Sequence, residues 1–500
     1  VNMTKQLDLL LINAPSRIGV YGPLSEFAAI EPPVWALFIT RYCLNRGYSV
    51  EILDAEAEGL TTSQTAALIN EINPKLAVFC IYGQQPSAST QCLPAARETA
   101  MMVDGRVPTL ALGTHPSALP ERTLREGPWT YVCQGEGPYQ TNSILGGLKH
   151  YSNDDHPILS PGVWTKTPDN KIYFTHAEEL IQQLDDQLPN QAWELLDMKK
   201  YRPHHWHLWT GDPNGGYASV QTSLGCPWKC QFCCINIPFG GNGYRMWSPA
   251  NVAAQIANLV NAFGITNIKI PDEMFVLNRQ HVWQICNHLI DMKLGDQLNI
   301  WAYARIDTVK DTQLLDKMRR AGFKWLGIGI ESASKHVRDG VEKGRFGNEQ
   351  ITQAVGRVKA AGIRVGANYI FGLPDDTLGS MRKTFDLACE INSSYSNFYT
   401  AMAYPGAPLH KTAQEKGWLL PEDTDSGWAG YSQHNYYTLP LPTETLTAAE
   451  VLAFRDNAFM NYHLRPEYLN TLRTTFGDQA VEDMKNILAL GKPKRKLLGD

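Results

Sequence analysis

The chain has 500 residues, of which 43% are hydrophobic and 19% charged, and a formal charge of −5. This length exceeds one ordinary core, so two or three domains are expected. The mild negative charge excludes a general attraction to nucleic acid or to anionic membranes, and no apolar run is long enough to span a bilayer. Since the N-terminus also lacks a secretory signal, we expect a cytoplasmic protein with no nucleic-acid or membrane partner.

Residues 1–148 alternate strand and helix. The buried strands are predicted in "LDLLLINAP", "SVEILDAE", "KLAVFCIYG", "PTLALGTH" and "YVCQGEG", with helices in "PPVWALFITRYCLNRG", in "TTSQTAALINEI" and near 88–103. This alternation predicts an α/β fold with a doubly wound parallel sheet, which binds ligands at the carboxyl ends of its strands. The sequences there, "NAPSR", "IYGQQPS", "GTHPSALP" and "QGEGP", are rich in small and turn-forming residues. They suit either close approach to a ligand or the ordinary turns of a flavodoxin-like sheet.

Residues 149–215 are expected to connect two domains. They are rich in proline, acidic and aromatic residues and contain His204, His205 and His207. Because no matching acidic ligand accompanies these histidines, we favour a segment that helps line a substrate cavity over a metal site.

Four of the ten cysteines lie in "SLGCPWKCQFCCINIPFG". Cys226, Cys230 and Cys233 form Cys-x3-Cys-x2-Cys, whereas a structural zinc site needs a fourth ligand and commonly a second Cys-x2-Cys pair. Three thiolates leave one iron of a 4Fe-4S cluster open to another ligand. We expect Cys234 to be a small buried residue, because neighbouring side chains diverge. The other six cysteines lie in apolar contexts and suggest no disulfides.

Six further strands are predicted between residues 216 and 410, in "YASVQTSL", "NIKIPDEM", "NIWAYARID", "KWLGIGIES", "RVGANYIFGLP" and "NFYTAMAYPG", with amphipathic helices between them. This repeat predicts a partial (β/α)6 barrel with its chemistry at the carboxyl ends of the strands. Residues 411–500 are predicted to form a mainly helical C-terminal domain, in which "WAGYSQHNYYTL" reaches towards the substrate. The basic group Lys492, Lys494, Arg495 and Lys496 is expected to be a solvated terminus rather than a binding patch.

The cysteine frame, followed by these strand ends, resembles the radical S-adenosylmethionine (SAM) superfamily, and residues 5–148 resemble the cobalamin domain of its cobalamin-dependent members. The resemblance implies a 4Fe-4S cluster on Cys226, Cys230 and Cys233. It implies that SAM contacts Phe232, Asp272, Glu273, Glu331, Ser332, Phe371 and Gly372, and that Arg305 is suited to the methionyl carboxylate. For cobalamin it implies Gly113, Thr114, His115, Pro116, Gln134, Gly135, Glu136 and Gly137.

One departure from that family concerns the loop after the first strand. Many cobalamin domains carry Asp-x-His-x-x-Gly there, with the histidine on cobalt, but this chain has "NAPSRIGVYG". The nearest imitation, "DDHPIL" at 154–159, lacks the glycine and lies beyond the domain. We therefore predict cobalamin without a histidine below the cobalt. The resemblance places Tyr82, Gly83 and Gln84 at that face, with Tyr82, Gln84 or neither as ligand.

The resemblance implies a methyltransferase acting on an unactivated carbon of a small molecule, with a deoxyadenosyl radical removing hydrogen and methylcobalamin supplying the methyl group. It also implies an external electron donor such as a flavodoxin or ferredoxin, and we expect a monomer. Three alternatives remain open: a cobalamin-dependent radical SAM enzyme that rearranges, cyclises or oxidises its substrate, a non-catalytic cobalamin or metal sensor, and an enzyme whose N-terminal domain is a relic that binds no cofactor. The sequence does not identify the substrate or its contacts.

Overall fold

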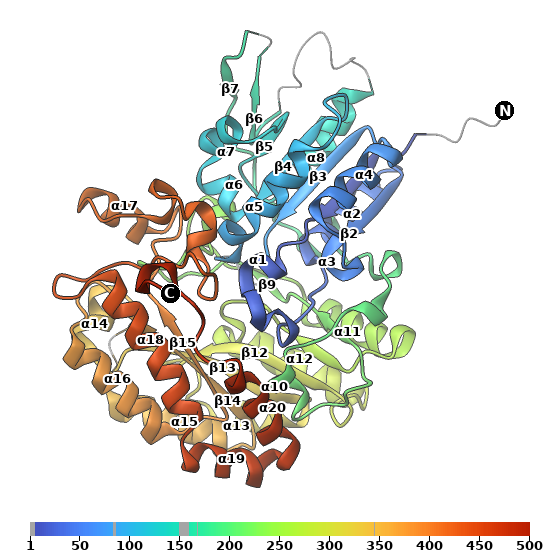
Figure 1. Cartoon of the computed structure of the whole chain (residues 1–500). Coiled ribbons are helices and arrows are strands. Elements are labelled where there is room, and N and C mark those ends of the chain that lie inside the picture. The colour runs from blue at the N-terminus through green and yellow to red at the C-terminus, as the bar shows by residue number, and fades with distance from the viewer. Residues whose placement is uncertain (1–5, 84–86, 150–159, 168, 345) are drawn as a thin grey trace.

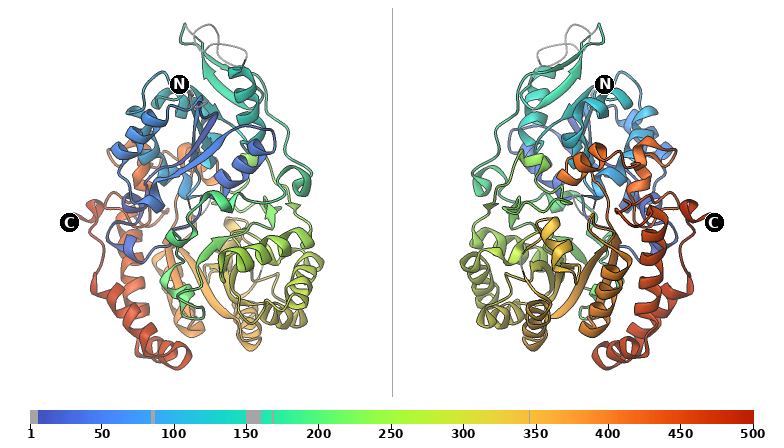
Figure 2. Two further views of the ribbon diagram at one scale, coloured as in Figure 1. Left: turned by 90° about the vertical axis from the view of Figure 1, so that its right-hand side faces the viewer. Right: turned by 90° about the vertical axis from the view of Figure 1, so that its left-hand side faces the viewer.

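A computed structural model describes residues 6–83, 87–149, 160–167, 169–344 and 346–500. It has an N-terminal sheet domain packed on a second domain built around a curved sheet, with the C-terminal helices along one side of the second domain (Figures 1 and 2). Within the described residues no helix is long and apolar enough to cross a membrane.

The N-terminal sheet confirms the predicted doubly wound arrangement. Its five parallel strands are ordered β2-β1-β3-β4-β5, with bounds Leu9–Asn13 (β1), Val50–Asp54 (β2), Leu76–Ile81 (β3), Thr109–Gly113 (β4) and Tyr131–Cys133 (β5). The helices are α1 (Arg17–Tyr21), α2 (Val34–Leu44), α3 (Ala55–Glu58), α4 (Thr62–Ile72), α5 (Ala88–Met101), α6 (Thr114–Ala118), α7 (Pro120–Glu126) and α8 (Pro138–Leu148). The strand after β1 is added on one side of it (β2), and the following strands are added on the other side (β3, β4 and β5). The gap between β1 and β3 is the reversal point of the sheet, and such folds bind ligands there.

Helices and strands form here for the reasons that the sequence indicates. Every residue of β3 and β4 is buried, as expected of strands covered by helices on both faces. Helix α4 begins with a capping box, in which Thr61 and Gln64 satisfy each other's backbone N–H groups.

The segment between the domains contributes structure of its own. The short strands β6 (Val163–Lys166) and β7 (Ile172–Phe174) extend the N-terminal sheet in antiparallel fashion, beyond β5. The segment then forms α9 (Leu184–Gln187) and α10 (His205–Leu208).

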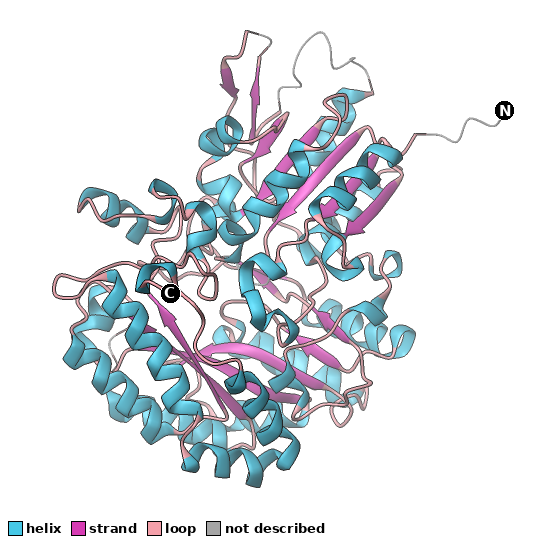
Figure 3. Cartoon of the chain, in the orientation of Figure 1, coloured by secondary structure: helices cyan, strands magenta, loops and turns pink. Residues whose placement is uncertain are grey.

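The second sheet is a parallel half-barrel of six strands, as predicted (Figure 3). Its order is β15-β14-β13-β12-β11-β8, with β8 (Tyr217–Ser219), β11 (Asn267–Lys269), β12 (Asn299–Arg305), β13 (Phe323–Glu331), β14 (Arg364–Phe371) and β15 (Tyr395–Thr400). Its helices are α11 (Pro249–Phe263), α12 (Arg279–Asp291), α13 (Thr312–Arg320), α14 (Lys335–Gly340), α15 (Asn348–Ala360) and α16 (Leu378–Ile391). The predicted first strand is split: β8 ends at Ser219, and Ser223–Leu224 (β9) pairs instead with β10 (Arg245–Met246).

The C-terminal region is mainly helical, as predicted, with α17 (Pro408–Glu415), α18 (Ala448–His463), α19 (Pro466–Phe476) and α20 (Asp478–Ala489). Helix α18 packs against β14 and β15 at the open edge of the half-barrel. The expectation of a solvated basic terminus is wrong for Arg495, which is 0% exposed. Its guanidinium forms a double hydrogen bond with Asp456 of α18, which pins the C-terminal segment to the domain.

Asp54, at the end of β2, gives the fold a predictable dependence on pH. It accepts hydrogen bonds from Asn13 and from Tyr201 of the connecting segment, and burial raises its pKa to about 6 despite them. The folded chain therefore holds a proton at pH values where the unfolded chain has lost it. The stability contributed by protonated Asp54 is fully present below about pH 4, near the pKa of the unfolded chain. It falls by about 3 kcal/mol as the pH rises through the folded-state pKa of about 6. Denaturant midpoints at pH 5 and pH 7 should show a shallower fall for Asp54→Asn than for the parent chain. An equal fall in both proteins would contradict this assignment.

Candidate functional site

A cavity of about 410 Å³ lies between the two domains. On the barrel side its wall is formed by residues of β11 to β15. They include the predicted carboxyl ends, with Lys269, Arg305 and Glu331, but the wall also continues along the strands to Trp325 and Tyr395 near their amino ends. On the other side it is lined by Val20 and Tyr21 of α1 and by Ser87 and Ala88 at the start of α5.

The thiol loop forms one end of this cavity. Cys226, Cys230, Cys233 and Cys234 all line it, and none of the ten cysteines is in a disulfide. Asn236 closes the loop, because its side chain accepts from the Cys226 N–H at 2.9 Å and donates to the Cys226 carbonyl at 2.7 Å. Cys234 is 4% exposed, which agrees with a small buried residue.

The three thiols of the predicted cluster frame share one space. Within the described residues, no group of three or more His, Cys, Asp or Glu side chains is placed to hold a metal ion. In a cluster each thiolate binds a different iron, so its three ligands need only face the same space. Cys226, Cys230 and Cys233 meet that condition.

Charged side chains surround the thiols. Arg305, at the end of β12, lies with Nη1 3.7 Å from Cys230 Sγ, forms an ion pair with Asp307 and stacks on Trp228. Glu331 pairs with Lys343 at 2.5 Å. Glu331 has φ +66°, an uncommon conformation for a non-glycine residue, which ends β13 with this side chain at the cavity.

Glu273 and Phe232, two of the predicted SAM contacts, also line the cavity. Burial raises the pKa of Glu273 to about 7, although Lys343 and Lys269 act in the opposite direction. A carboxyl group that titrates near neutrality beside three thiols is typical of a functional site.

Four other predicted SAM contacts lie away from this cavity. Asp272 accepts hydrogen bonds from Thr222 and Ser223, and Ser332 contacts Thr384 of α16. Phe371 stacks on Phe398 and contacts Phe454 edge-to-face. Gly372 follows with φ +79°, and a Cβ there would lie 2.5 Å from Val451. These residues hold strand ends in place, and their predicted contact with SAM remains a prediction.

A second, smaller cavity of about 140 Å³ adjoins the first and shares Val20, Tyr21, Ala88, Ile235 and Glu273 with it. It lies at the reversal point of the N-terminal sheet. The end of β1 and the start of α1 contribute Asn13, Ser16 and Arg17, and the loop after β3 contributes Tyr82 and Gly83.

The wall of the second cavity is aromatic. Trp35 of α2 stacks on Tyr82 at 5.0 Å between ring centroids, and the buried Tyr82 hydroxyl has no partner among the described residues. Gly83 has φ +69°, and a Cβ there would lie 2.7 Å from that of Ala88, so this turn requires glycine. No described residue lining the second cavity is a histidine. Gln84 and 154–159 lie outside the described residues.

Of the residues predicted around cobalamin after β4, only Thr114 lines the second cavity. Gly113 allows close packing, since a Cβ there would clash with the Ile81 carbonyl. Pro116 is buried within α6. His115 packs against Trp428 and contacts Thr90, and burial lowers its pKa to about 3.

None of the four residues predicted around cobalamin in the loop after β5 lines either cavity. Gln134 accepts from Trp164, Gly135 donates to Ser117, and Gly137 packs over Ile39. Glu136, only 4% exposed, pairs with Arg245 of β10 at 2.7 Å. This loop therefore joins the sheet domain to the thiol-bearing domain.

The histidines of the connecting segment separate into two groups. His204 and His205 line the large cavity, which agrees with the preferred interpretation of this segment. His207 is fully buried and contacts the Asn299 carbonyl at 2.9 Å.

Several cavity residues were not predicted. A buried ion pair at 2.7 Å joins Glu31 of the N-terminal domain to Lys269 of β11. Trp35 and Arg455 were also missed, and neither lies in a local motif, so the sequence offers no signal for them. His434 lies in "WAGYSQHNYYTL", the segment expected to reach towards the substrate, and it lines the large cavity.

Residues 220–388 match the radical SAM superfamily. The chain is 26% identical over 469 residues to an uncharacterized methyltransferase of Pyrococcus horikoshii, covering 93% of this chain and 94% of that one. It is 25% identical over 445 residues to the anaerobic magnesium-protoporphyrin IX monomethyl ester cyclase of Rubrivivax gelatinosus, covering 88% and 74%.

Among solved structures, the radical SAM methyltransferase TsrM from Kitasatospora setae, with cobalamin and a 4Fe-4S cluster bound, aligns with a TM-score of 0.66 at 16% identity, covering 97% of this chain and all of that one. Together with the cysteine frame and the half-barrel, these similarities show a radical SAM domain over residues 220–388, within a two-domain fold like that of TsrM.

Proposed function

We propose that this chain is a cobalamin-dependent radical SAM methyltransferase that methylates an unactivated carbon of a small molecule. One observation carries the proposal: the thiol-lined cavity adjoins the cavity at the reversal point of the N-terminal sheet, and Glu273 lies on the wall of both. Two cofactors bound at these places would face a common space. TsrM, which shares the fold, was solved with cobalamin and a 4Fe-4S cluster.

Cys226, Cys230 and Cys233 would hold the cluster. Arg305 and the pair formed by Glu331 and Lys343 offer a cation, an anion and hydrogen-bond donors for the zwitterionic methionyl part of SAM. The cluster and SAM supply one-electron cleavage chemistry when bound, and cobalamin supplies a transferable methyl group. The protein positions these groups and excludes water from the cavity between the domains.

For cobalamin, the aromatic wall of Trp35 and Tyr82 and the turn at Gly83 fit a flat group held between the domains. Tyr82 would then cover the lower face of the cobalt, and its unpartnered hydroxyl would gain a partner in the cofactor or a bound water.

A second candidate function is a reaction without methyl transfer. It is favoured by the similarity to the Rubrivivax gelatinosus cyclase over 88% of this chain. The same cavity residues would serve either reaction, because both begin with SAM cleavage.

The deciding experiment is anaerobic reconstitution with iron, sulfide and hydroxocobalamin, followed by incubation with methyl-labelled SAM and a strong reductant. We expect about four irons per chain, a cobalamin absorbance spectrum and deoxyadenosine release. Label in a product from a candidate-substrate mixture would support methylation, whereas product without label would support the second function. Iron near zero and no deoxyadenosine would contradict both.

A further inference from the structure

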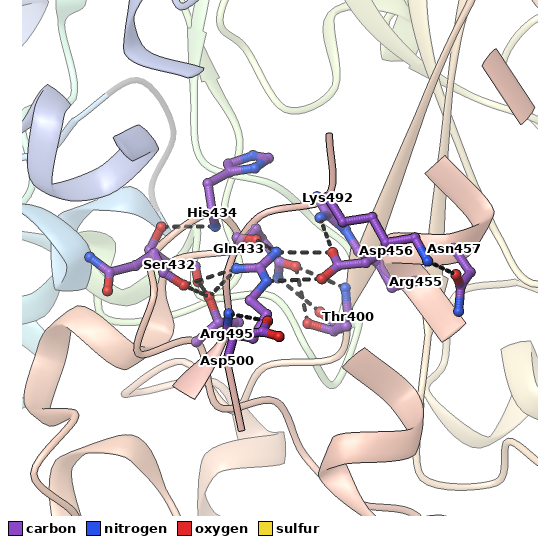
Figure 4. Close-up of polar contacts among 12 residues, drawn as sticks. Thr400, Ser432, Gln433, His434, Arg455, Asp456, Asn457, Lys492, Arg495 and Asp500 are labelled. Atoms are coloured by element: carbon purple, nitrogen blue, oxygen red, sulfur yellow. Dashed lines mark hydrogen bonds and ion pairs between the residues drawn. The ribbon is translucent and has the colours of Figure 1, made fainter. Parts of the chain in front are cut away.

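A group of buried charges lies at the side of the large cavity where α18 meets β15 (Figure 4). Arg455 of α18 lines the cavity but is only 5% exposed. Its Nε donates to the Phe398 carbonyl at 2.7 Å and its Nη1 to Asp456 at 2.8 Å. Among the described residues Nη2 has no hydrogen-bond partner. Arg455 therefore keeps a donor available on the cavity wall.

This group has more positive than negative charge. Arg495 forms two hydrogen bonds, both at 2.9 Å, with the same Asp456 that pairs with Arg455. The other guanidinium donors of Arg495 go to neutral acceptors, namely the carbonyls of Gln433 and Asn435 and the Thr438 hydroxyl. The Asp500 carboxylate accepts from the main-chain N–H of Arg495. Two guanidinium groups thus share one carboxylate, and the three side chains carry a net charge of about +1 at neutral pH.

The other cations of the cavity are each held by a carboxylate. Lys269 pairs with Glu31, Arg305 with Asp307, and Lys343 with Glu331. Arg455 differs from them because it shares its carboxylate with Arg495 and keeps Nη2 available, so an anion on the cavity wall would give it a second acceptor.

His434 also lines the large cavity and offers a second polar side chain there. Its ring stacks on Tyr21 with centroids 5.6 Å apart, points away from Arg495 in Figure 4, and has a buried Nδ1 with no partner among the described residues. Burial, reinforced by Arg455 and Arg495, lowers the pKa of His434 well below its usual range. The neutral ring retains one N–H, so it can donate a hydrogen bond.

The loop that carries His434 is held firmly. Ser432 donates to the Val20 carbonyl of the N-terminal domain at 2.5 Å. The Gln433 side chain accepts from the Thr400 N–H and donates to the Thr400 carbonyl, both at 2.9 Å. The ring is thus fixed at the cavity wall before any ligand arrives, which reduces the entropy lost on binding.

We propose that Arg455 and His434 form a subsite for the carboxylate of the substrate, and that the substrate is a carboxylic acid with a planar apolar body. The body would pack on the aromatic wall that includes Trp206, Tyr395 and Phe398. A net charge of about +1 suits a monoanionic carboxylate better than a dianionic phosphate. This inference rests on the proposed function, since it names the substrate class of that cavity.

The test uses the anaerobic chain loaded with cluster and cobalamin and three probes: 2-naphthylacetate, 2-naphthylacetamide and 2-naphthyl phosphate. Isothermal titration should show 2-naphthylacetate binding at least about tenfold more tightly than the neutral amide, as a charge-assisted hydrogen bond implies. Arg455→Met should abolish this preference, because affinity for the acid should fall far more than affinity for the amide. Arg473→Met, which removes the same charge from an exposed ion pair on α19, should keep the preference.

His434→Phe gives an independent check if Arg455→Met fails to fold, because phenylalanine preserves the stacking on Tyr21. It should weaken 2-naphthylacetate by about threefold or more, as expected for the loss of one hydrogen bond, with an unchanged cobalamin spectrum. Equal affinity for acid and amide, preference for the phosphate, no acid binding at about 10 mM, or a preference that survives in both cavity variants would overturn the subsite. Deoxyadenosine release by the unmodified chain, measured on the same samples, tests the proposed function separately.

Discussion

Replacement of Cys226, Cys230 or Cys233 by alanine is expected to abolish cluster assembly and, with it, deoxyadenosine formation. The three thiols line one end of the same cavity and supply every protein ligand that a site-open cluster needs. Removal of one leaves two irons without a protein ligand. Iron and sulfide per chain after anaerobic reconstitution, together with deoxyadenosine release, measure the effect, which should be a fall to background in each variant.

Cys234→Ala is the matched control, since it removes a thiol from the same loop and the same cavity wall. Cys234 is 4% exposed and adjoins a ligand, so its variant should lose some packing but retain about four irons per chain. If Cys234→Ala lost its iron while a variant of the other three retained it, the division into three ligands and one buried residue would be wrong.

The succession of strands along the chain and the position of the thiols could be predicted, because both depend on local sequence. A strand covered on both faces appears as a continuous apolar run, as "LAVFCI" of β3 does. A cluster ligand set is encoded by spacing alone, because Cys226, Cys230 and Cys233 lie within one loop. The position of the second cavity at the reversal point of the N-terminal sheet also follows from fold class, since parallel sheets bind ligands at the carboxyl ends of their strands.

The polar residues at the barrel strand ends could be located but not oriented. Glu331 ends β13 and reaches the cavity, whereas Ser332, the first residue after the strand, contacts Thr384 of α16. Asp272 and Glu273 lie in the loop after β11: Asp272 holds Thr222 and Ser223, and Glu273 lines both cavities. Outside a regular strand no alternation rule predicts which of two neighbouring side chains faces the cavity.

Contacts between distant segments could not be predicted. Lys269 and Glu31 are separated by 238 residues, and Arg245 and Glu136 by 109. No spacing rule connects such pairs. The predicted solvent exposure of Arg495 was wrong for the same reason. Its burial depends on the ion pair with Asp456, 39 residues earlier in the chain, which local sequence does not indicate.

Asp456→Asn is expected to be the most destabilising single substitution in the C-terminal region. Burial by itself would raise the pKa of Asp456, but the hydrogen bonds and charges of Arg495 and Arg455 more than offset this and lower it. The carboxylate is thus ionised, and it is the one charge that separates two buried guanidinium groups. Asparagine keeps the shape and leaves both cations uncompensated, which should cost about 3 to 5 kcal/mol. Thermal and urea midpoints would measure this loss.

The pattern among variants identifies the cause. Arg495→Gln alone should destabilise less than Asp456→Asn, because Asp456 then still pairs with Arg455 at 2.8 Å. Combining the two should recover part of the loss, since only one buried guanidinium remains without a carboxylate. Arg473→Gln breaks an ion pair whose side chains are 53% and 88% exposed and should change the midpoints little. If the double variant were less stable than Asp456→Asn, repulsion between the two guanidinium groups would not be the reason that this carboxylate is needed.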